Sequence, residues 1–213
     1  MSERRALVVA NGESPSLALV RSLAEGVDLV VGADGGGDLA LAAGLIPAIV
    51  VGDLDSLSEA GRMRIGADSC LRIDDPDTTD LEKAVQYCVE AGYRRIDIVA
   101  AGGGRADHAL GNLSVLVVYA RQAEIHIHDD DFDISRVSGT ATIDAPPGTV
   151  VSLIGIGPCS GVTTRGLRWE LTDYAANFSP YGIHNEVRER PARVSVKSGD
   201  LLLFRGRWIE KHR

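Results

Sequence analysis

Two carboxylates follow a strongly apolar run in the first half of the chain. Asp53 and Asp55 come just after residues 48–51, which are apolar throughout. Such a run predicts a buried strand, and an open α/β sheet keeps its ligand site at the carboxyl ends of its strands. In an extended strand, residues two apart point to the same side, so both carboxylates are expected to project into one crevice. Paired carboxylates share a proton or bind a hard cation, and Mg²⁺ with phosphate oxygens suits them.

Three further acidic segments could take part in the same chemistry. Residues 33–38 and 102–108 combine glycines with aspartates directly after predicted strands. Glycines at a strand-to-helix turn let backbone N–H groups approach a phosphate, although tight packing is the alternative reason for them. Residues 74–80 hold four aspartates ahead of a predicted helix. Helix capping by Thr79 needs only one polar side chain, so mutual repulsion of the others again favours a bound cation.

Short apolar runs and helical patterns alternate over residues 1–128, as in a parallel sheet covered on both faces. A helix is predicted from Leu81 to Val89, with a capping box formed by Thr79 and Glu82. A second helix is predicted over residues 110–117, with Asp107 as its N-cap. The predicted strands are residues 6–10, 29–32, 48–51, 96–100 and 124–127.

No helical stripe occurs after residue 128, where short strand-like runs are separated by Gly, Pro and Asp clusters. This pattern is typical of a β-sandwich. We therefore predict an α/β fold class with two domains, a Rossmann-like parallel-sheet domain over residues 1–129 and an all-β sandwich over residues 130–213. The strands predicted in the second domain are residues 140–143, 150–156, 162–164, 167–171, 194–196 and 201–204.

Composition excludes several classes of function. The net charge of −8 argues against a nucleic-acid surface, and no apolar stretch approaches the length needed to span a membrane. None of the three lysines follows a glycine as a Walker-type phosphate loop requires, so arginine and metal must offset phosphate charge. The three cysteines are far apart, which suits a reducing compartment, and the N-terminus does not resemble a signal peptide. The expected location is the cytoplasm.

Four segments in this order and spacing resemble the signatures of the thiamine pyrophosphokinase family: residues 33–36, 52–56, 77–84 and 103–108. Two segments of the second half, residues 166–171 and 185–186, are also similar to that family. The resemblance implies transfer of a diphosphoryl group from ATP to the hydroxyl of thiamine, which gives thiamine diphosphate and AMP. It also implies a Rossmann-like domain followed by a β-sandwich, and a homodimer.

The resemblance also assigns roles to residues. Mg²⁺ would be held by Asp53, Asp55 and Asp80, and Arg105 would lie along the phosphates. The acceptor would lie near His184 and Asn185, in a stretch that also holds Trp169 and Tyr181. Residues expected at the nucleotide are Asp34, Gly35, Gly36, Thr79, Gly103, Gly104, Arg105 and His108. Residues expected to take part in catalysis are Asp53, Asp77, Arg105 and Asp107, and the proton acceptor is either an aspartate or a metal-bound water.

Three positions depart from the family pattern: Asp38, Pro76 and His184 replace a common Asn, Gln and Ser. They leave open a diphosphokinase of the same fold that acts on another hydroxymethyl heterocycle, such as a pterin. A nucleotide-sensing module without catalysis is a second alternative. A Mg²⁺-dependent phosphatase with Asp53 as nucleophile fits poorly, because such motifs follow the first strand of a domain. No dinucleotide-binding fingerprint follows the first strand here, which disfavours a dehydrogenase.

Overall fold

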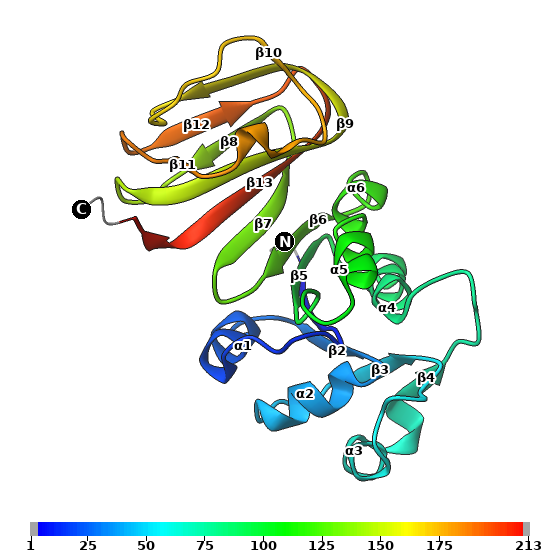
Figure 1. The fold of residues 1–213 in the computed structure, drawn as a ribbon. Helices are drawn as coiled ribbons and strands as arrows, with labels where there is room; N and C mark the ends of the chain where they lie inside the picture. The colour runs from blue at the N-terminus through cyan, green and yellow to red at the C-terminus, as the bar shows by residue number, and fades with distance from the viewer. Residues whose placement is uncertain (1–3, 211–213) are drawn as a thin grey trace. The chain divides into compact units, whose positions relative to one another are not determined.

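The computed structural model describes residues 4–210, and the chain forms a mixed α/β fold of two compact units (Figure 1). The first unit runs from Met1 to Asp130 and the second from Asp131 to Arg213. No helix within residues 4–210 is both long and apolar enough to cross a membrane. All three cysteines are free thiols.

The first unit alternates strands and helices. Its strands are β1 (Arg5–Val9), β2 (Leu29–Ala33), β3 (Ile49–Gly52), β4 (Cys70–Arg72), β5 (Arg95–Val99) and β6 (Glu124–His128). Its helices are α1 (Leu17–Ala24), α2 (Gly36–Ala42), α3 (Glu59–Ile65), α4 (Asp80–Glu90), α5 (Ala106–Asn112) and α6 (Val115–Val118), with a short 3-10 turn at Ala67–Ser69. The five strands predicted for this half from apolar runs are confirmed within one residue at each end.

All strands of the first unit are parallel, in the order β4-β3-β2-β1-β5-β6. Leu7 and Val99 are fully buried, since helices cover both faces of the sheet. The chain builds outward from β1 to β4 and then crosses over to β5 on the other side of β1. The carboxyl ends of β1 and β5 thus form the switch point at which a parallel sheet opens a crevice.

Close packing of α2 on β1 explains one of the glycines. A Cβ atom at Gly36 would lie 1.9 Å from the carbonyl oxygen of Val9, so no other residue fits there without a shift of the helix. Gly35 lies against the side chain of Asn11 in the same way. These two glycines therefore bring α2 close to the sheet.

The predicted second helix of this unit is wrong in two respects. Residues 106–118 form two short helices, α5 and α6, instead of one. The N-cap residue is Arg105, and Asp107 lies in the first turn. Gly111 and Asn112 favour a helix end, which explains the break. Leu110 and Val118 are more than half exposed, so the apolar pattern here is only partly a core pattern.

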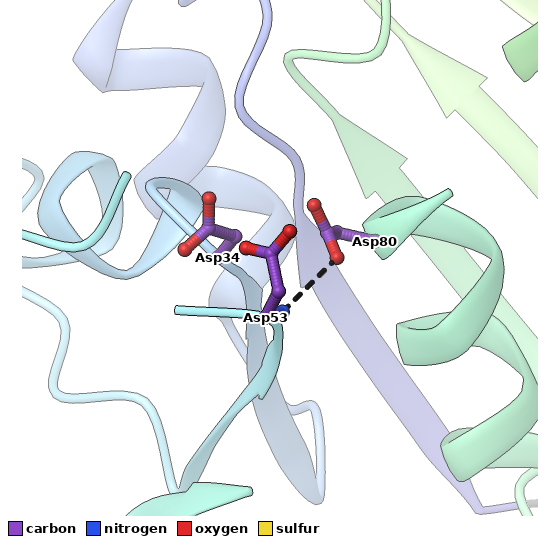
Figure 2. Close-up of side chains that lie close together, drawn as sticks. All are labelled: Asp34, Asp53 and Asp80. Carbon is purple, nitrogen blue, oxygen red and sulfur yellow. Dashed lines mark hydrogen bonds between the residues drawn. The ribbon is translucent and has the colours of Figure 1, made fainter. Parts of the chain in front are cut away.

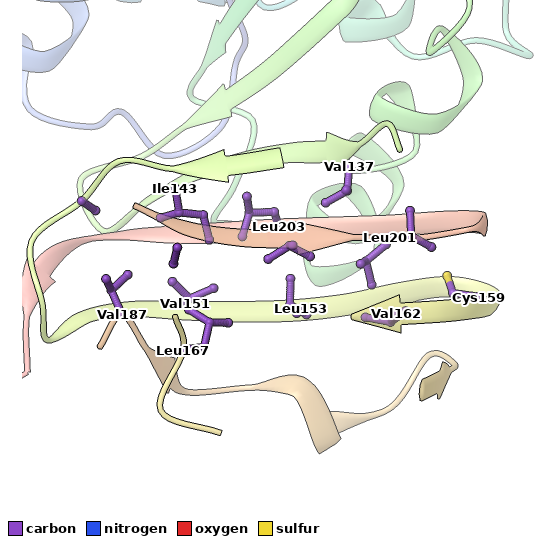
Figure 3. Packing of buried hydrophobic residues seen from close by; sticks show 14 residues of the cluster. Val137, Ile143, Val151, Leu153, Cys159, Val162, Leu167, Val187, Leu201 and Leu203 are labelled. Atoms are coloured by element: carbon purple, nitrogen blue, oxygen red, sulfur yellow. The ribbon is translucent and has the colours of Figure 1, made fainter. Parts of the chain in front are cut away.

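The second unit consists of antiparallel strands around a second apolar core. The strands are β7 (Phe132–Val137), β8 (Thr140–Ile143), β9 (Thr149–Arg165), β10 (Tyr174–Ala176), β11 (Asn185–Glu186), β12 (Ala192–Ser195) and β13 (Ser198–Ile209), with a 3-10 turn at Pro180–Gly182. The long β9 pairs with β13 over most of its length and with β12 near its end. Figure 3 shows the buried side chains, among them Val151, Leu153, Leu201 and Leu203, gathered between the strands.

Three of the strands predicted in this unit differ from the structure. Residues 150–156 and 162–164 belong to one continuous strand, β9. Residues 167–171 are not a strand, although Leu167 forms a single bridge with Val187. Gly166 has a φ of +75°, and its N–H donates to the carboxylate of Glu170, so the chain turns here instead of extending. Three strands of this unit, β7, β10 and β11, were not predicted.

Candidate active site

A cavity of about 620 Å³ lies at the carboxyl edge of the parallel sheet. Its walls come from the segments that follow β1, β2, β3 and β5, together with residues 75–83. It therefore opens at the switch point between β1 and β5, where the strand order predicts a ligand site.

Three carboxylates converge in this cavity: those of Asp34, Asp53 and Asp80 (Figure 2). Asp34 follows β2, Asp53 follows β3, and Asp80 opens α4. One oxygen from each side chain lies within 4.8 Å of the others, which is within the reach of a single ion. The backbone N–H of Asp53 also donates to Asp80 Oδ1 at 3.3 Å. Oxygen ligands of this kind suit a hard divalent cation.

Asp34 is the most buried member of the group, with 2% of its surface exposed. Its carboxylate accepts hydrogen bonds from the backbone N–H groups of Ser56 and Leu57, so it also holds the loop after β3. Burial raises the pKa of the Asp34 carboxyl, and the hydrogen bonds with Ser56 oppose that rise. Its backbone φ of +46° is unusual for a non-glycine residue and is typical of functional sites.

Asp55 does not join the three carboxylates. The expected extended geometry is wrong here, because β3 ends at Gly52 and Leu54 has a φ of +66°. This left-handed residue turns the chain, and the exposed carboxylate of Asp55 accepts a hydrogen bond from the hydroxyl of Ser56 instead. The N–H of Asp55 donates to Asp53 Oδ1 at 3.1 Å.

The acidic segment before α4 forms a turn and a helix cap. Asp75 accepts hydrogen bonds from the N–H of Asp77 and the hydroxyl of Thr78, and these bonds lower the pKa of the Asp75 carboxyl. Thr79 Oγ1 accepts the N–H of Glu82 at 3.2 Å, so the predicted N-cap of α4 is confirmed. Within residues 4–210, the return bond from the Thr79 N–H to Glu82 that would complete the predicted capping box is not formed, and the Glu82 carboxylate accepts from the hydroxyl of Tyr119. Asp77 and Thr79 both line the cavity.

The glycine segment after β5 also lines the cavity. Gly103 and Gly104 have φ values of +75° and +62°, a conformation that glycine adopts without strain. The guanidinium of Arg105 donates to both oxygens of Asp107, at 3.1 and 2.6 Å, and this contact lowers the pKa of Asp107 to about 2. Arg105 and His108 line the cavity, whereas Asp107 lies outside its lining.

Other expected nucleotide residues lie elsewhere. Gly35 and Gly36 are packed between α2 and β1 and do not line the cavity. Asp38, one of the departures from the family pattern, accepts hydrogen bonds from both the N–H and the hydroxyl of Ser58 and thereby supports the start of α3.

Asn11 and Lys83 are among the cavity residues for which no role was predicted from the sequence. Asn11 follows β1 and faces Gly35, and Lys83 projects from α4 to Asp80. The signal for Lys83 is present in the spacing, because residues three apart on a helix share a face. For Asn11 the only signal is its place at the end of the first strand.

Sequence models of one family match both units of the chain. The model described as "Thiamin pyrophosphokinase, catalytic domain" matches residues 20–128, slightly more than half of the chain. The model described as "Thiamin pyrophosphokinase, vitamin B1 binding domain" matches residues 140–201. The chain belongs to the thiamine pyrophosphokinase family.

Relatives and solved structures in this family agree with the assignment. Thiamine pyrophosphokinase 3 of Oryza sativa subsp. japonica is 31% identical over 174 residues, which cover 74% of this chain and 65% of the relative. Thiamine pyrophosphokinase 1 of Arabidopsis thaliana is 30% identical, with 74% and 64% covered. The matches thus span somewhat less than two thirds of these relatives. The crystal structure of thiamine pyrophosphokinase from Bacillus subtilis superposes with a TM-score of 0.83 at 27% identity, covering 95% of this chain and 99% of that one.

In the second unit, the family's Asn-Glu segment holds a loop together. Asn185 Oδ1 accepts the N–H groups of Trp169 and Glu186, at 3.1 and 2.8 Å, and Asn185 Nδ2 donates to the carbonyl of Trp169 at 2.7 Å. The indole of Trp169 is about half exposed, and the guanidinium of Arg168 lies 4.8 Å from its ring centre.

The family's common Ser is His184 here, and its backbone is strained. His184 has a φ of +64°, and its N–H donates to the hydroxyl of Ser152 at 3.0 Å. The exposed imidazole lies 3.8 Å from the carboxylate of Glu210. Asn185 therefore acts on the loop through backbone contacts, whereas the side chain of His184 projects to the surface.

Proposed function

We propose that this chain is an ATP-dependent diphosphotransferase that converts thiamine to thiamine diphosphate and releases AMP. The observation that carries the proposal is the group of Asp34, Asp53 and Asp80 at the switch point, in a chain whose two units match the two domains of one family. Diphosphoryl transfer depends on positioning and charge neutralisation more than on covalent protein chemistry, and this cavity offers both.

The proposed division of labour follows the two predicted domains. Residues 1–129 form the Rossmann-like domain that holds nucleotide and metal, and residues 130–213 form the β-sandwich that holds the acceptor and builds a homodimer. The cytoplasm is the proposed location, and the three free thiols favour such a reducing compartment.

The residues present fit a magnesium ion. Asp53 and Asp80 contribute two of three convergent carboxylates, and Asp34 supplies the third. Asp55 is the third ligand that the resemblance implies. It is exposed and lies two residues beyond Asp53, and we retain it as a proposed ligand. Mg²⁺ would neutralise charge on the phosphate oxygens as the transferred group moves.

The protein's own groups would orient the nucleotide. Arg105 presents a planar fork at the mouth of the cavity, and such a fork suits bidentate contact with phosphate. The backbone at Gly103 and Gly104 can approach phosphate closely, and Thr79 and His108 border the same space. In the reaction, the alcohol oxygen bonds to the β-phosphorus, the bond between that phosphorus and the α–β bridging oxygen breaks, and AMP leaves with this oxygen.

The attacking alcohol must lose a proton to a nearby base. Asp77, which is exposed and lines the cavity, is one candidate, and Asp53 is another. Asp107 is the poorest base of the three, because its contact with Arg105 holds its pKa at about 2. Its proposed role is to orient Arg105.

The acceptor ring is proposed to contact the Trp169 loop of the second unit. Trp169 offers a half-exposed aromatic surface, and Asn185 fixes the backbone beneath it. His184 precedes Asn185, whose side chain bonds to the Trp169 backbone, and is proposed to border the ring.

The test is incubation with ATP, Mg²⁺ and a panel of heterocyclic alcohols that includes thiamine and a hydroxymethyl pterin. We expect AMP and thiamine diphosphate in equal amounts. AMP formed only with the pterin would identify the alternative diphosphokinase. Nucleotide binding without AMP would favour a sensing module, and phosphate release without an acceptor would favour a phosphatase.

A further inference from the structure

Lys83 lines the proposed metal and nucleotide site, and its side chain is buried there. Residues 4–210 contain two lysines, of which Lys197 is at the surface and Lys83 is buried. The side chain of Lys83 is only 6% exposed, and its ammonium Nζ lies 3.0 Å from Asp80 Oδ1. Burying an ammonium costs free energy unless a negative group accepts its hydrogen bonds. Asp80 is that group for Lys83, so the folded protein needs the two side chains as a pair.

This pairing fixes one oxygen of Asp80. Asp80 Oδ1 accepts both the Lys83 ammonium at 3.0 Å and the N–H of Asp53 at 3.3 Å. Within residues 4–210, no hydrogen bond to Asp80 Oδ2 is found. Two donors thus set the orientation of the carboxylate before any cation arrives.

The charge of Lys83 also acts on whatever binds there. Mg²⁺ lies about 2.1 Å from a carboxylate oxygen, so an ion on Asp80 would lie within roughly 7 Å of the ammonium. That distance is inside the Debye length, and the Lys83 side chain is buried, so the two cations would repel each other. A metal bound to ATP carries a net negative charge, which the same ammonium attracts and the three carboxylates repel.

We propose that Lys83 determines the form in which the metal enters: it disfavours the bare divalent cation and favours a cation already bound to a polyphosphate. The proposal rests on the metal role proposed above for Asp34, Asp53 and Asp80. The cavity supports it, because Lys83 and Asp80 line the same cavity as the glycine segment 102–104 and Arg105.

The test measures binding without turnover. Mn²⁺ binding is followed by electron paramagnetic resonance, first with Mn²⁺ alone and then with Mn²⁺ and α,β-methylene-ATP, which cannot be cleaved at the transferred bond. In Lys83→Met we expect bare Mn²⁺ to bind about tenfold tighter and the Mn²⁺–nucleotide complex about tenfold more weakly. Lys83→Gln is one atom shorter but still has N–H groups that can donate to Asp80, and it carries no charge. It should likewise bind bare Mn²⁺ more tightly and the Mn²⁺–nucleotide complex more weakly.

Lys197→Met is the matched control, since it removes one lysine charge from an exposed pair with Asp173 in the second unit. It should bind both probes like the unaltered protein. The proposal compares two affinities, that for bare Mn²⁺ and that for the Mn²⁺–nucleotide complex. An unchanged ratio of these affinities in both Lys83 variants, weaker binding of bare Mn²⁺, or no binding of either probe would overturn it. If Lys83→Met does not fold, Lys83→Gln decides alone. The expected ratios without any AMP formation would refute only the proposed function, and AMP formation with unchanged ratios would refute only the role of Lys83.

Discussion

At the carboxyl edge of the first unit, three like charges from three separate elements face one another, whereas in the second unit Asn185 uses its amide to bind one neighbouring loop. The first arrangement costs free energy without a cation, because carboxylates at such distances repel. The second stabilises the protein by itself. A group of side chains with like charges that repel one another therefore indicates a bound ligand. A polar side chain whose hydrogen bonds are made within the protein indicates a structural role.

Backbone strain shows the same contrast. Asp34, Leu54 and Ala100 have positive φ values, and each follows a strand of the parallel sheet at the cavity edge. Such conformations cost roughly 1 kcal/mol or more each for residues other than glycine. In the second unit, Asp173 and His184 share this feature. His184 adjoins Asn185, so this strain lies next to the residue that supports the Trp169 loop proposed for the acceptor.

The largest effect is expected from breaking the group of carboxylates. Asp80→Asn should lower kcat by at least about a hundredfold at saturating Mg²⁺, since it removes charge that positions the metal. Steady-state assays of AMP formation would measure it, with circular dichroism to verify folding. Asp74→Asn is the matched control, because Asp74 is exposed, pairs with Arg72 and does not line the cavity. Equal kcat values for the two variants would refute the metal assignment.

A smaller effect is expected at Arg105, which also lines the cavity. Arg105→Lys keeps the charge but loses the planar fork, so kcat/KM for ATP should fall roughly tenfold. The same exchange at Arg94, whose guanidinium donates to the carbonyl of Val89 on the exposed surface, should leave kcat/KM unchanged. If the Arg105→Lys variant retains normal kcat/KM for ATP, Arg105 does not contact the phosphates in a bidentate manner.

Local signals in the sequence were sufficient for much of the first unit. Apolar runs located five of its strands, and the cap by Thr79 depends on only four consecutive residues. Local sequence patterns could not predict which aspartates form the group of three carboxylates. The turn at Leu54, which separates Asp55 from Asp53, requires a left-handed residue that no local pattern announced. Asp34 was expected near the nucleotide, but its contacts with Ser56 and Leu57 arise only when β2 and β3 pair.

The second unit was less predictable because its strands are defined by partners distant in the sequence. β7 pairs with β13, some 64 residues or more along the chain, and its own sequence lacks clear alternation. Asn185 was expected beside the acceptor. Its bonds to Trp169 instead make it a support for that residue, a role that only the tertiary structure reveals.

The role of Asn185 can be tested through substrate selectivity. Asn185→Ala should raise KM for the acceptor about tenfold and leave KM for ATP nearly unchanged, because the Trp169 loop serves only one substrate in our proposal. Asn185→Asp keeps the oxygen that accepts from Trp169 and Glu186 but loses the donor to the Trp169 carbonyl. Its KM for the acceptor should therefore lie between those of the unaltered protein and Asn185→Ala. Equal changes in both constants would remove the loop from the acceptor site.

The smallest effect compares one helix cap in each unit. Thr79→Ala removes the acceptor for the N–H of Glu82 and should lower the free energy of unfolding by about 1 kcal/mol, whereas Thr79→Ser should retain most of it. Ser179→Ala removes a longer contact, 3.4 Å to the N–H of Tyr181, on a single 3-10 turn, and should cost less. Urea unfolding would measure both.

KM for ATP adds a second readout, since Thr79→Ser keeps the hydroxyl at the cavity wall. A raised KM in Thr79→Ala but not in Thr79→Ser would tie the hydroxyl to the nucleotide as well as to α4, and unchanged values in both would leave Thr79 as a cap alone.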